Sequence, residues 1–186
     1  MEKARILIVE DEAIIAMELE SQIQSLGYEV TSIVDTGEKA ITKAEEDKPD
    51  LILMDIRIKG EMDGIDAAEE IRNRFGIPVI FSTAYLDEER IERAKITMPF
   101  GYVLKPIQER DLKVTLEMAL YVSRVDAERR KSEEVLERIF NLTPDPICTA
   151  GADGYFKQLN TAWEEILGYT KEELFSKPLL EFIHPD

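Results

Sequence analysis

The chain has 186 residues, 44% of them hydrophobic, and its 39 acidic and 23 basic side chains give a net charge of −16. This length is enough for one domain with an additional segment or for two small domains. The negative charge argues against nucleic acid as a direct partner, and no apolar run approaches the roughly 20 residues of a membrane-spanning helix. The single cysteine, Cys148, excludes an internal disulfide, and the N-terminus lacks a signal-peptide pattern. We therefore expect a cytoplasmic protein without membrane contact, unless the chain is part of a longer membrane protein.

The first part of the chain alternates between short apolar runs and segments with helical spacing. The apolar runs predict five strands, at residues 4–9, 28–34, 51–55, 78–83 and 101–106. Apolar residues at helical spacing predict helices between them, at about 14–26, 36–47, 63–75 and 87–97. This order predicts an α/β fold, a doubly wound five-stranded parallel sheet with right-handed crossovers and helices on both faces.

The segment from residue 111 to about 142 contains no glycine or proline. Nine positions in it follow the a and d spacing of a coiled coil, and seven of the nine are apolar. We call these nine positions the seam: Val114, Met118, Tyr121, Val125, Glu128, Ser132, Val135, Ile139 and Leu142. The pattern indicates one extended helix with a possible coiled-coil seam. The alternative is a core-packing helix followed by a charged linker.

The sequence Pro144-Asp145-Pro146 interrupts the helix and marks a boundary. Two short strands are expected after it, at 147–150 and 155–159, joined by a Gly/Asp turn. Helices are expected at 161–167 and 170–175, the second with a capping box between Thr170 and Glu173. The predicted domains are therefore residues 1–121, a helical linker at 122–142, and a smaller segment at 143–186.

Polar side chains stand where the strands of the predicted parallel sheet end. Glu10 and Asp11 follow the first strand, Asp55 ends the third, Thr83 the fourth and Lys105 the fifth. Ligands bind at this edge of open α/β sheets. Clustered carboxylates need a cation, and hard oxygen ligands favour Mg²⁺, while a lysine and a hydroxyl suit a phosphoryl group. Taken alone, Asp55 could equally cap a helix, but within this group it is interpreted as a nucleophile that accepts phosphate.

No glycine-rich phosphate loop is present in the sequence, so nucleotide binding is not indicated. Residues 4 to about 120 instead resemble a two-component response-regulator receiver domain. Five motifs in order carry the resemblance: Glu10-Asp11, Asp55 after an apolar strand, Met62-Asp63-Gly64, Thr83-Ala84, and Tyr102-Val103-Leu104-Lys105-Pro106. The resemblance implies a flavodoxin-like fold with strand order 2-1-3-4-5.

The resemblance also implies roles for the residues at the strand ends. Asp55 would be the phospho-acceptor, and Lys105 would contact the phosphoryl group. Asp11 would ligate Mg²⁺ directly and Glu10 through water, while Asp55 and the backbone carbonyl of Arg57 would complete the protein ligands. A sensor histidine kinase would be the phosphoryl donor, and the protein would not be an enzyme beyond its own phosphotransfer and dephosphorylation.

Thr83, which also belongs to the catalytic group, and Tyr102 would form the switch pair that moves on phosphorylation. The loop at 56–62 departs from the family pattern, because it lacks the usual proline and is one residue longer. Arg57 and Tyr85 occupy the variable positions that flank the phosphoryl site. They would either shield the acyl phosphate from water or be ordinary exposed loop residues.

Residues from about 132 to 186 resemble the start of a PAS sensor domain. The matching residues are Ile139-Phe140, Pro144-Asp145-Pro146-Ile147, Asp153-Gly154, Asn160, Trp163, Leu167-Gly168-Tyr169, Glu172-Glu173-Leu174 and His184-Pro185-Asp186. A PAS domain normally continues with three more strands, so the segment is expected to be an incomplete α+β unit. The only histidine, His184, lacks the neighbouring acid of a kinase phospho-acceptor box.

These observations favour a phosphorelay function in which a phosphorylated receiver acts on a linked helix and a PAS-like segment. Two other classes remain open, a Mg²⁺-dependent phosphohydrolase with Asp55 as nucleophile and a docking module that is never phosphorylated. The hydrolase would require a second acid near Asp55 and a substrate cap, and the docking module would be expected to lack Asp55, Asp11 or Lys105. A homodimer is expected, through a receiver face or through the linker helix.

Overall fold

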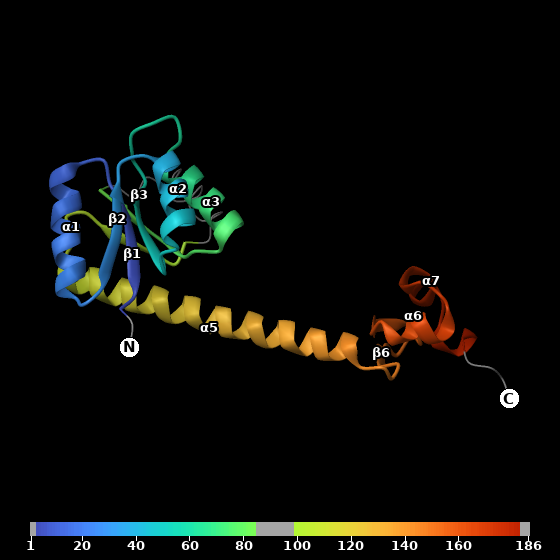
Figure 1. Cartoon of the computed structure of the whole chain (residues 1–186). Helices are drawn as coiled ribbons and strands as arrows, with labels where there is room; N and C mark the ends of the chain where they lie inside the picture. The colour runs from blue at the N-terminus through green and yellow to red at the C-terminus, as the bar shows by residue number, and fades with distance from the viewer. Residues whose placement is uncertain (1–2, 85–98, 183–186) are drawn as a thin grey trace. The chain divides into compact units, whose positions relative to one another are not determined.

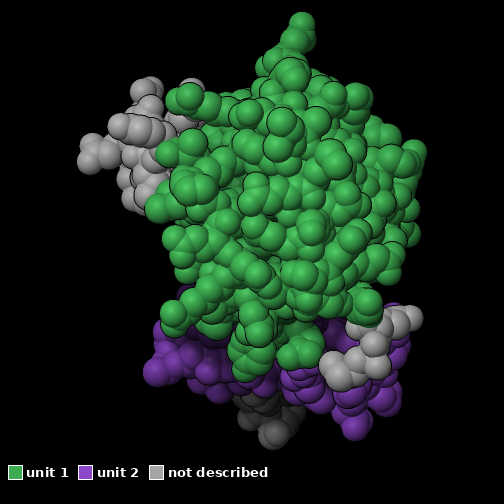
Figure 2. All heavy atoms as spheres, turned by 90° about the vertical axis from the view of Figure 1, so that its left-hand side faces the viewer, with its two compact units in different colours: residues 1–125 green, residues 126–186 purple. Residues whose placement is uncertain are grey.

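The computed structural model describes residues 3–84 and 99–182 (Figure 1). The chain divides into two units, residues 1–125 and residues 126–186, which are coloured green and purple in Figure 2. The helix predicted at 87–97, Tyr85 and His184 lie outside the described residues. None of the described helices combines the length and the apolar composition of a membrane span.

A five-stranded parallel sheet forms the centre of the first unit, as predicted. Its strands are β1 (Arg5–Val9), β2 (Glu29–Val34), β3 (Leu51–Asp55), β4 (Val79–Thr83) and β5 (Gly101–Leu104). Their order is β2-β1-β3-β4-β5, and each neighbouring pair is parallel. The predicted fold class is therefore confirmed, although β5 ends at Leu104 rather than at Pro106, whose ring nitrogen has no hydrogen to donate.

Within its described residues, the first unit contains the helices α1 (Ala13–Ser25), α2 (Gly37–Asp47), α3 (Gly64–Phe75) and the start of α5 (Glu109–Leu142). Local capping sets two of their beginnings. The Thr36 hydroxyl accepts a hydrogen bond from the amide of Lys39, and the Asp63 carboxylate accepts from the amides of Ile65 and Asp66. Each cap satisfies amides that have no partner inside the helix.

Alternate residues of each strand pack into two separate hydrophobic layers. Leu7, Val9 and Met54 belong to the layer that packs against α2 and α3. Ile8 and Leu53 belong to the layer that packs against α1 and the first turns of α5. The helices accordingly lie on both sides of the sheet (Figure 1). Because both faces of the sheet are buried, the central strands have continuous apolar sequences.

Helix α5 continues without a break from Glu109 to Leu142, which confirms the extended helix rather than a charged linker. Leu112, Leu116 and Ala119 are buried in the first unit. The seven apolar residues of the seam are all exposed, from 43% at Val125 to 75% at Leu142. The seam therefore has no partner within the described part of this chain, and its pairing stays a prediction.

The second unit contains β6 (Cys148–Ala150) and β7 (Phe156–Leu159), paired antiparallel, then α6 (Ala162–Leu167), α7 (Lys171–Ser176) and the short 3₁₀ helix η1 (Leu179–Glu181). Its small core is built on Phe156, Leu159 and Leu174. The predicted capping box is present, since the Thr170 and Glu173 side chains each accept from the other's amide.

Asn160 joins the end of α5 to the rest of the second unit. Its side chain is fully buried, and Nδ2 donates to the carbonyls of Phe140, Thr143 and Asp145 at 3.0, 3.2 and 2.8 Å. Its Oδ1 accepts from the amide of Ile147 at 3.0 Å. The carbonyl of Phe140 needs such a donor, because the residue four positions later is a proline without an N–H. The sequence marked Asn160 only as part of the PAS resemblance and did not predict this joint.

Candidate functional site

Strand alternation brings three charged residues to one side of the sheet edge. Glu10 and Lys105 directly follow β1 and β5, and Asp55 is the last residue of β3. Each lies two positions after a buried residue of the layer facing α1 and α5, namely Ile8, Leu53 and Val103. Because side chains two positions apart point to the same face of a strand, the three groups converge on that side.

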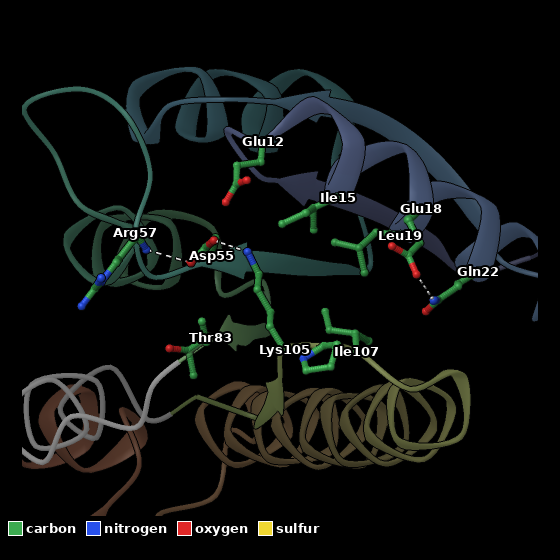
Figure 3. Close-up of a pocket in the computed structure, with 12 residues that line it drawn as sticks. Glu12, Ile15, Glu18, Leu19, Gln22, Asp55, Arg57, Thr83, Lys105 and Ile107 are labelled. Carbon is green, nitrogen blue, oxygen red and sulfur yellow. Dashed lines mark hydrogen bonds and ion pairs between the residues drawn. The ribbon is translucent and has the colours of Figure 1, made fainter.

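Lys105 bridges the two acids, and Figure 3 shows its contact with Asp55. Its Nζ lies 2.7 Å from Glu10 Oε2 and also forms an ion pair with Asp55 Oδ2. The other carboxylate oxygen of Asp55, Oδ1, accepts a hydrogen bond of 2.8 Å from the amide of Arg57. Both acids are buried, with 2% of Glu10 and 6% of Asp55 exposed. The Asp55 carboxylate is thus held in place by hydrogen bonds from two sides.

Asp11 completes a group of three carboxylates, which we call the acid cluster. Glu10, Asp11 and Asp55 each offer an oxygen, and these oxygens lie within 4.8 Å of one another. Such a set of hard oxygen donors fits Mg²⁺, which binds through one or two carboxylates and keeps several waters. The chemistry of the acid cluster therefore agrees with the magnesium site predicted from the sequence.

Burial and charge alter the acid–base properties of this cluster. Burial, assisted by the nearby charge of Asp55, raises the pKa of Glu10 even though the hydrogen bond from Lys105 opposes the change. Burial also acts strongly to lower the pKa of Lys105, but the hydrogen bonds to Asp55 and Glu10 outweigh it, so the pKa is raised. Lys105 is therefore charged at neutral pH. The ionised form of Glu10 is less favoured in this cluster than in water, so a further cation beside it would stabilise that form.

A cavity of about 530 Å³ opens beside Asp55 and Lys105. It runs between α1 and the segment after β5, and its apolar lining includes Ile15, Leu19 and Ile107 (Figure 3). In the sequence, Ile15 and Leu19 are apolar residues at helical spacing in the helix predicted at about 14–26, and Ile107 was given no role. The helical spacing showed that they share a face, but it could not show that this face borders the acid cluster.

The remaining predicted residues lie around this centre in different ways. Thr83 is buried at the end of β4 and lines the cavity. Tyr102 packs with the layer on the other face of the sheet, its ring centroid 5.9 Å from that of Phe81. Arg57 contacts Asp55 through its amide, and its side chain points away from that carboxylate (Figure 3). The structure therefore brings together Glu10, Asp11, Asp55, Thr83 and Lys105, whereas Tyr102 lies with the hydrophobic layer on the other face of the sheet.

The loop between β3 and α3, whose conformation the sequence left uncertain, reaches back to β1. Lys59 pairs with Thr36 in an isolated parallel bridge. Its Nζ donates to the backbone carbonyl of Asp11 at 3.1 Å and lies 3.7 Å from Asp11 Oδ2. Sequence reasoning gave Lys59 no role, and its only signal was the unusual length of the loop.

Comparison with known proteins agrees with this geometry. The family model of the response regulator receiver domain matches residues 6–117, and that of the PAS fold matches residues 134–186. The transcriptional regulatory protein PdtaR of Mycobacterium tuberculosis is 38% identical over 116 residues, which cover 62% of this chain and 56% of that protein. The chain thus spans little more than half the length of this relative.

Two solved structures are similar to the first unit. The signal receiver domain of a modulated diguanylate cyclase from Desulfovibrio desulfuricans G20 is 37% identical, with a TM-score of 0.65 over 67% of this chain and 99% of that one. The second is the receiver domain of a sensor histidine kinase from Pseudomonas aeruginosa PAO1, which was solved with a magnesium ion coordinated in its active-site cleft. It is 32% identical, with a TM-score of 0.58, and the match covers 64% of this chain and 98% of that one. With the acid cluster, the bridging lysine and the strand order already established, the chain belongs to the response regulator receiver family of two-component regulatory systems, and a PAS fold segment follows its receiver domain.

Proposed function

We propose that Asp55 accepts a phosphoryl group from a phosphohistidine of a sensor histidine kinase, in a reaction that depends on Mg²⁺. The observation that carries the proposal is the buried Asp55 carboxylate, held by Lys105 and the Arg57 amide at the edge of the acid cluster. The cavity beside it gives a donor group access to that carboxylate.

In the proposed transfer, an oxygen of the Asp55 carboxylate forms a bond to phosphorus while the P–N bond of the phosphohistidine breaks. The imidazole nitrogen leaves with the bonding electron pair, and Asp55 becomes an acyl phosphate. Lys105, which stays protonated, stabilises the charge on the phosphoryl oxygens. Thr83 lines the same cavity and offers a hydroxyl donor to one of those oxygens.

Glu10, Asp11 and Asp55, with the backbone carbonyl of Arg57, would hold the Mg²⁺ ion, Glu10 through water. The ion would supply positive charge to neutralise the phosphoryl oxygens in the transition state. Support comes from the oxygen donor set of the acid cluster and from the magnesium ion in the similar P. aeruginosa receiver domain.

We further propose that Thr83 and Tyr102 are the switch pair that responds to phosphorylation. The output would pass from a receiver at residues 1–121, through a helical linker at 122–142, to the PAS-like segment at 143–186. The exposed seam of α5 would pair with a second copy of the chain. The negative net charge supports a cytoplasmic regulator that does not bind nucleic acid through this part of the protein.

The direct test is phosphorylation of the full chain by a small acyl phosphate, followed by intact-mass spectrometry. One phosphoryl group per chain is expected with Mg²⁺ and none after the metal is chelated. Asp55→Asn should abolish the adduct, while Asp66→Asn, at an exposed acid on α3, should leave it unchanged. Undiminished labelling of Asp55→Asn would refute the assignment. Continuous consumption of donor without a stable adduct would instead favour the phosphohydrolase.

A further inference from the structure

Lys59 lies beside the acid cluster and has so far been given no role in the site. Its ammonium group contacts Asp11 twice, at the backbone carbonyl and at the carboxylate. Asp11 is the most accessible of the three acids, and 20% of its side chain is exposed. Lys105 pairs with Glu10 and Asp55. The two lysines together therefore give every carboxylate of the acid cluster a positive partner.

The loop around Lys59 is attached to the fold on both sides. Ile58 and Met62 pack against the hydrophobic layer of α2 and α3. The backbone of Lys59 is held by its bridge to Thr36, which is also the N-cap of α2. The chain then turns at Gly60, whose φ is 115°. These attachments determine where the Lys59 side chain begins and direct it over the end of β1.

The Lys59 ammonium group and a divalent cation would compete for the carboxylate of Asp11. Carboxylate oxygens that coordinate Mg²⁺ lose their other cationic partner or must share it, and two cations so close repel each other. Lys59 is 67% exposed, so water and salt screen the pair and make it weak. A weak pair can open when the metal arrives, and the metal then has to overcome a modest opposing free energy.

We propose that Lys59 is a positioning residue that lowers the Mg²⁺ affinity of the unphosphorylated receiver by holding Asp11 in an ion pair that opens when the metal binds. This inference rests on the magnesium site of the proposed function. Removing the charge should raise the Mg²⁺ affinity roughly two- to tenfold, the range expected for an exposed ion pair together with weak cation repulsion. Retaining the charge in Lys59→Arg should retain most of the wild-type affinity.

The test is a Mg²⁺ titration of the full, unphosphorylated chain, followed by the NMR signal of the Arg57 amide, which donates to Asp55. The variants are Lys59→Gln, Lys59→Arg and the control Lys43→Gln, which removes the same charge from an ion pair with Glu46 on α2. Lys59→Gln should bind more tightly, and the other two should match the wild type. Raising the salt concentration should shrink the difference between Lys59→Gln and wild type.

The outcomes separate this inference from the function on which it rests. If the wild type binds Mg²⁺, Asp11→Asn loses the binding, and Lys59→Gln is no tighter than Lys43→Gln, then the role of Lys59 is wrong and the metal site stands. If Lys59→Gln binds more weakly, Lys59 supports the metal site and the proposal is likewise overturned. If the wild type shows no Mg²⁺-dependent shift of the Arg57 amide, the magnesium site itself fails, and the role of Lys59 fails with it.

Discussion

Replacing Asn160 with alanine should strongly destabilise the second unit. The substitution removes the donor shared by three backbone carbonyls and the acceptor of the Ile147 amide, all at 2.8–3.2 Å. The side chain is fully buried, so the groups it leaves are poorly placed to recover a partner. The carbonyl of Phe140 would then have no donor at the end of α5.

The size of the effect follows from these contacts. The two N–H groups of one amide can fully satisfy two acceptors, and its oxygen satisfies one donor. Each buried group left unsatisfied costs about 1–3 kcal/mol, but Thr143 and Ile147 lie near the surface, where water can replace part of the loss. We expect a loss of about 2–4 kcal/mol. A unit of about 60 residues has a total stability of only about 3–9 kcal/mol.

Trp163 makes the measurement specific to this unit, because it is the only tryptophan in the chain and packs on Phe156 with ring centroids 5.2 Å apart. Urea unfolding followed by its fluorescence should show a much lower midpoint for Asn160→Ala, or an unfolded spectrum before urea is added. Asn160→Asp should be worse, because a carboxylate would face three carbonyl oxygens. Gln158→Ala, at an exposed position of β7, is the control. A change below about 0.5 kcal/mol in Asn160→Ala, typical of a surface substitution, would refute the reasoning.

Three further predictions concern the first unit and α5. In Gly64→Ala, the added Cβ would lie 2.0 Å from the backbone carbonyl oxygen at the end of β3, so the backbone must shift and about 3 kcal/mol or more should be lost. In Gly27→Ala the added Cβ would meet open space, but the φ of 93° suits glycine, so the loss of stability should be near about 1 kcal/mol. Equal urea midpoints for the two variants, measured by circular dichroism, would contradict this contrast. The raised pKa of Glu10 means that, without Mg²⁺, the folded state takes up a proton before the unfolded state as the pH falls. Wild type should therefore gain stability relative to Glu10→Gln as the pH falls from 8 through the folded pKa towards the ordinary value of 4.5, and a pH-independent difference between their urea midpoints would count against it. Finally, Val125→Glu in the seam should shift the full chain towards monomer in sedimentation equilibrium, whereas Ala127→Glu, exposed and outside the seam, should not.

Interactions between residues close in the sequence, together with the pattern of apolar residues, determined the secondary structure of the chain and most of its fold. Predicted and observed ends differ by no more than two residues for the described elements that the sequence predicted, and only the short η1 was not predicted among them. The reason is that helix starts depend on side chains such as Thr36 and Asp63, which bond to amides two or three positions away. The apolar runs of β1 and β3 required burial on both faces, and the βα alternation then left few possible topologies.

The meeting of Glu10, Asp55 and Lys105 could also be predicted, because the carboxyl ends of parallel strands share one edge and alternation sets their side. Their hydrogen bonds could not be predicted. Whether Lys105 contacts one acid or both depends on strand spacing and on burial. Burial raises the pKa of Glu10 and acts to lower that of Lys105, whose pKa is raised only because the hydrogen bonds to Asp55 and Glu10 outweigh burial. These quantities exist only once the sheet and its two helical layers have formed.

Only the tertiary structure decided the roles of Lys59 and Asn160. Lys59 meets Asp11 across 48 positions in the sequence, and Asn160 meets Phe140 across 20. Periodicities of 2 and 3.6 residues say which side chains share a face, but they carry no information about where an irregular loop passes. That path is determined by what the loop packs on, here the contacts of Ile58 and Met62 with the layer of α2 and α3. An exposed lysine and a polar asparagine thus acquire their partners from the packing of distant segments rather than from their neighbours in the chain.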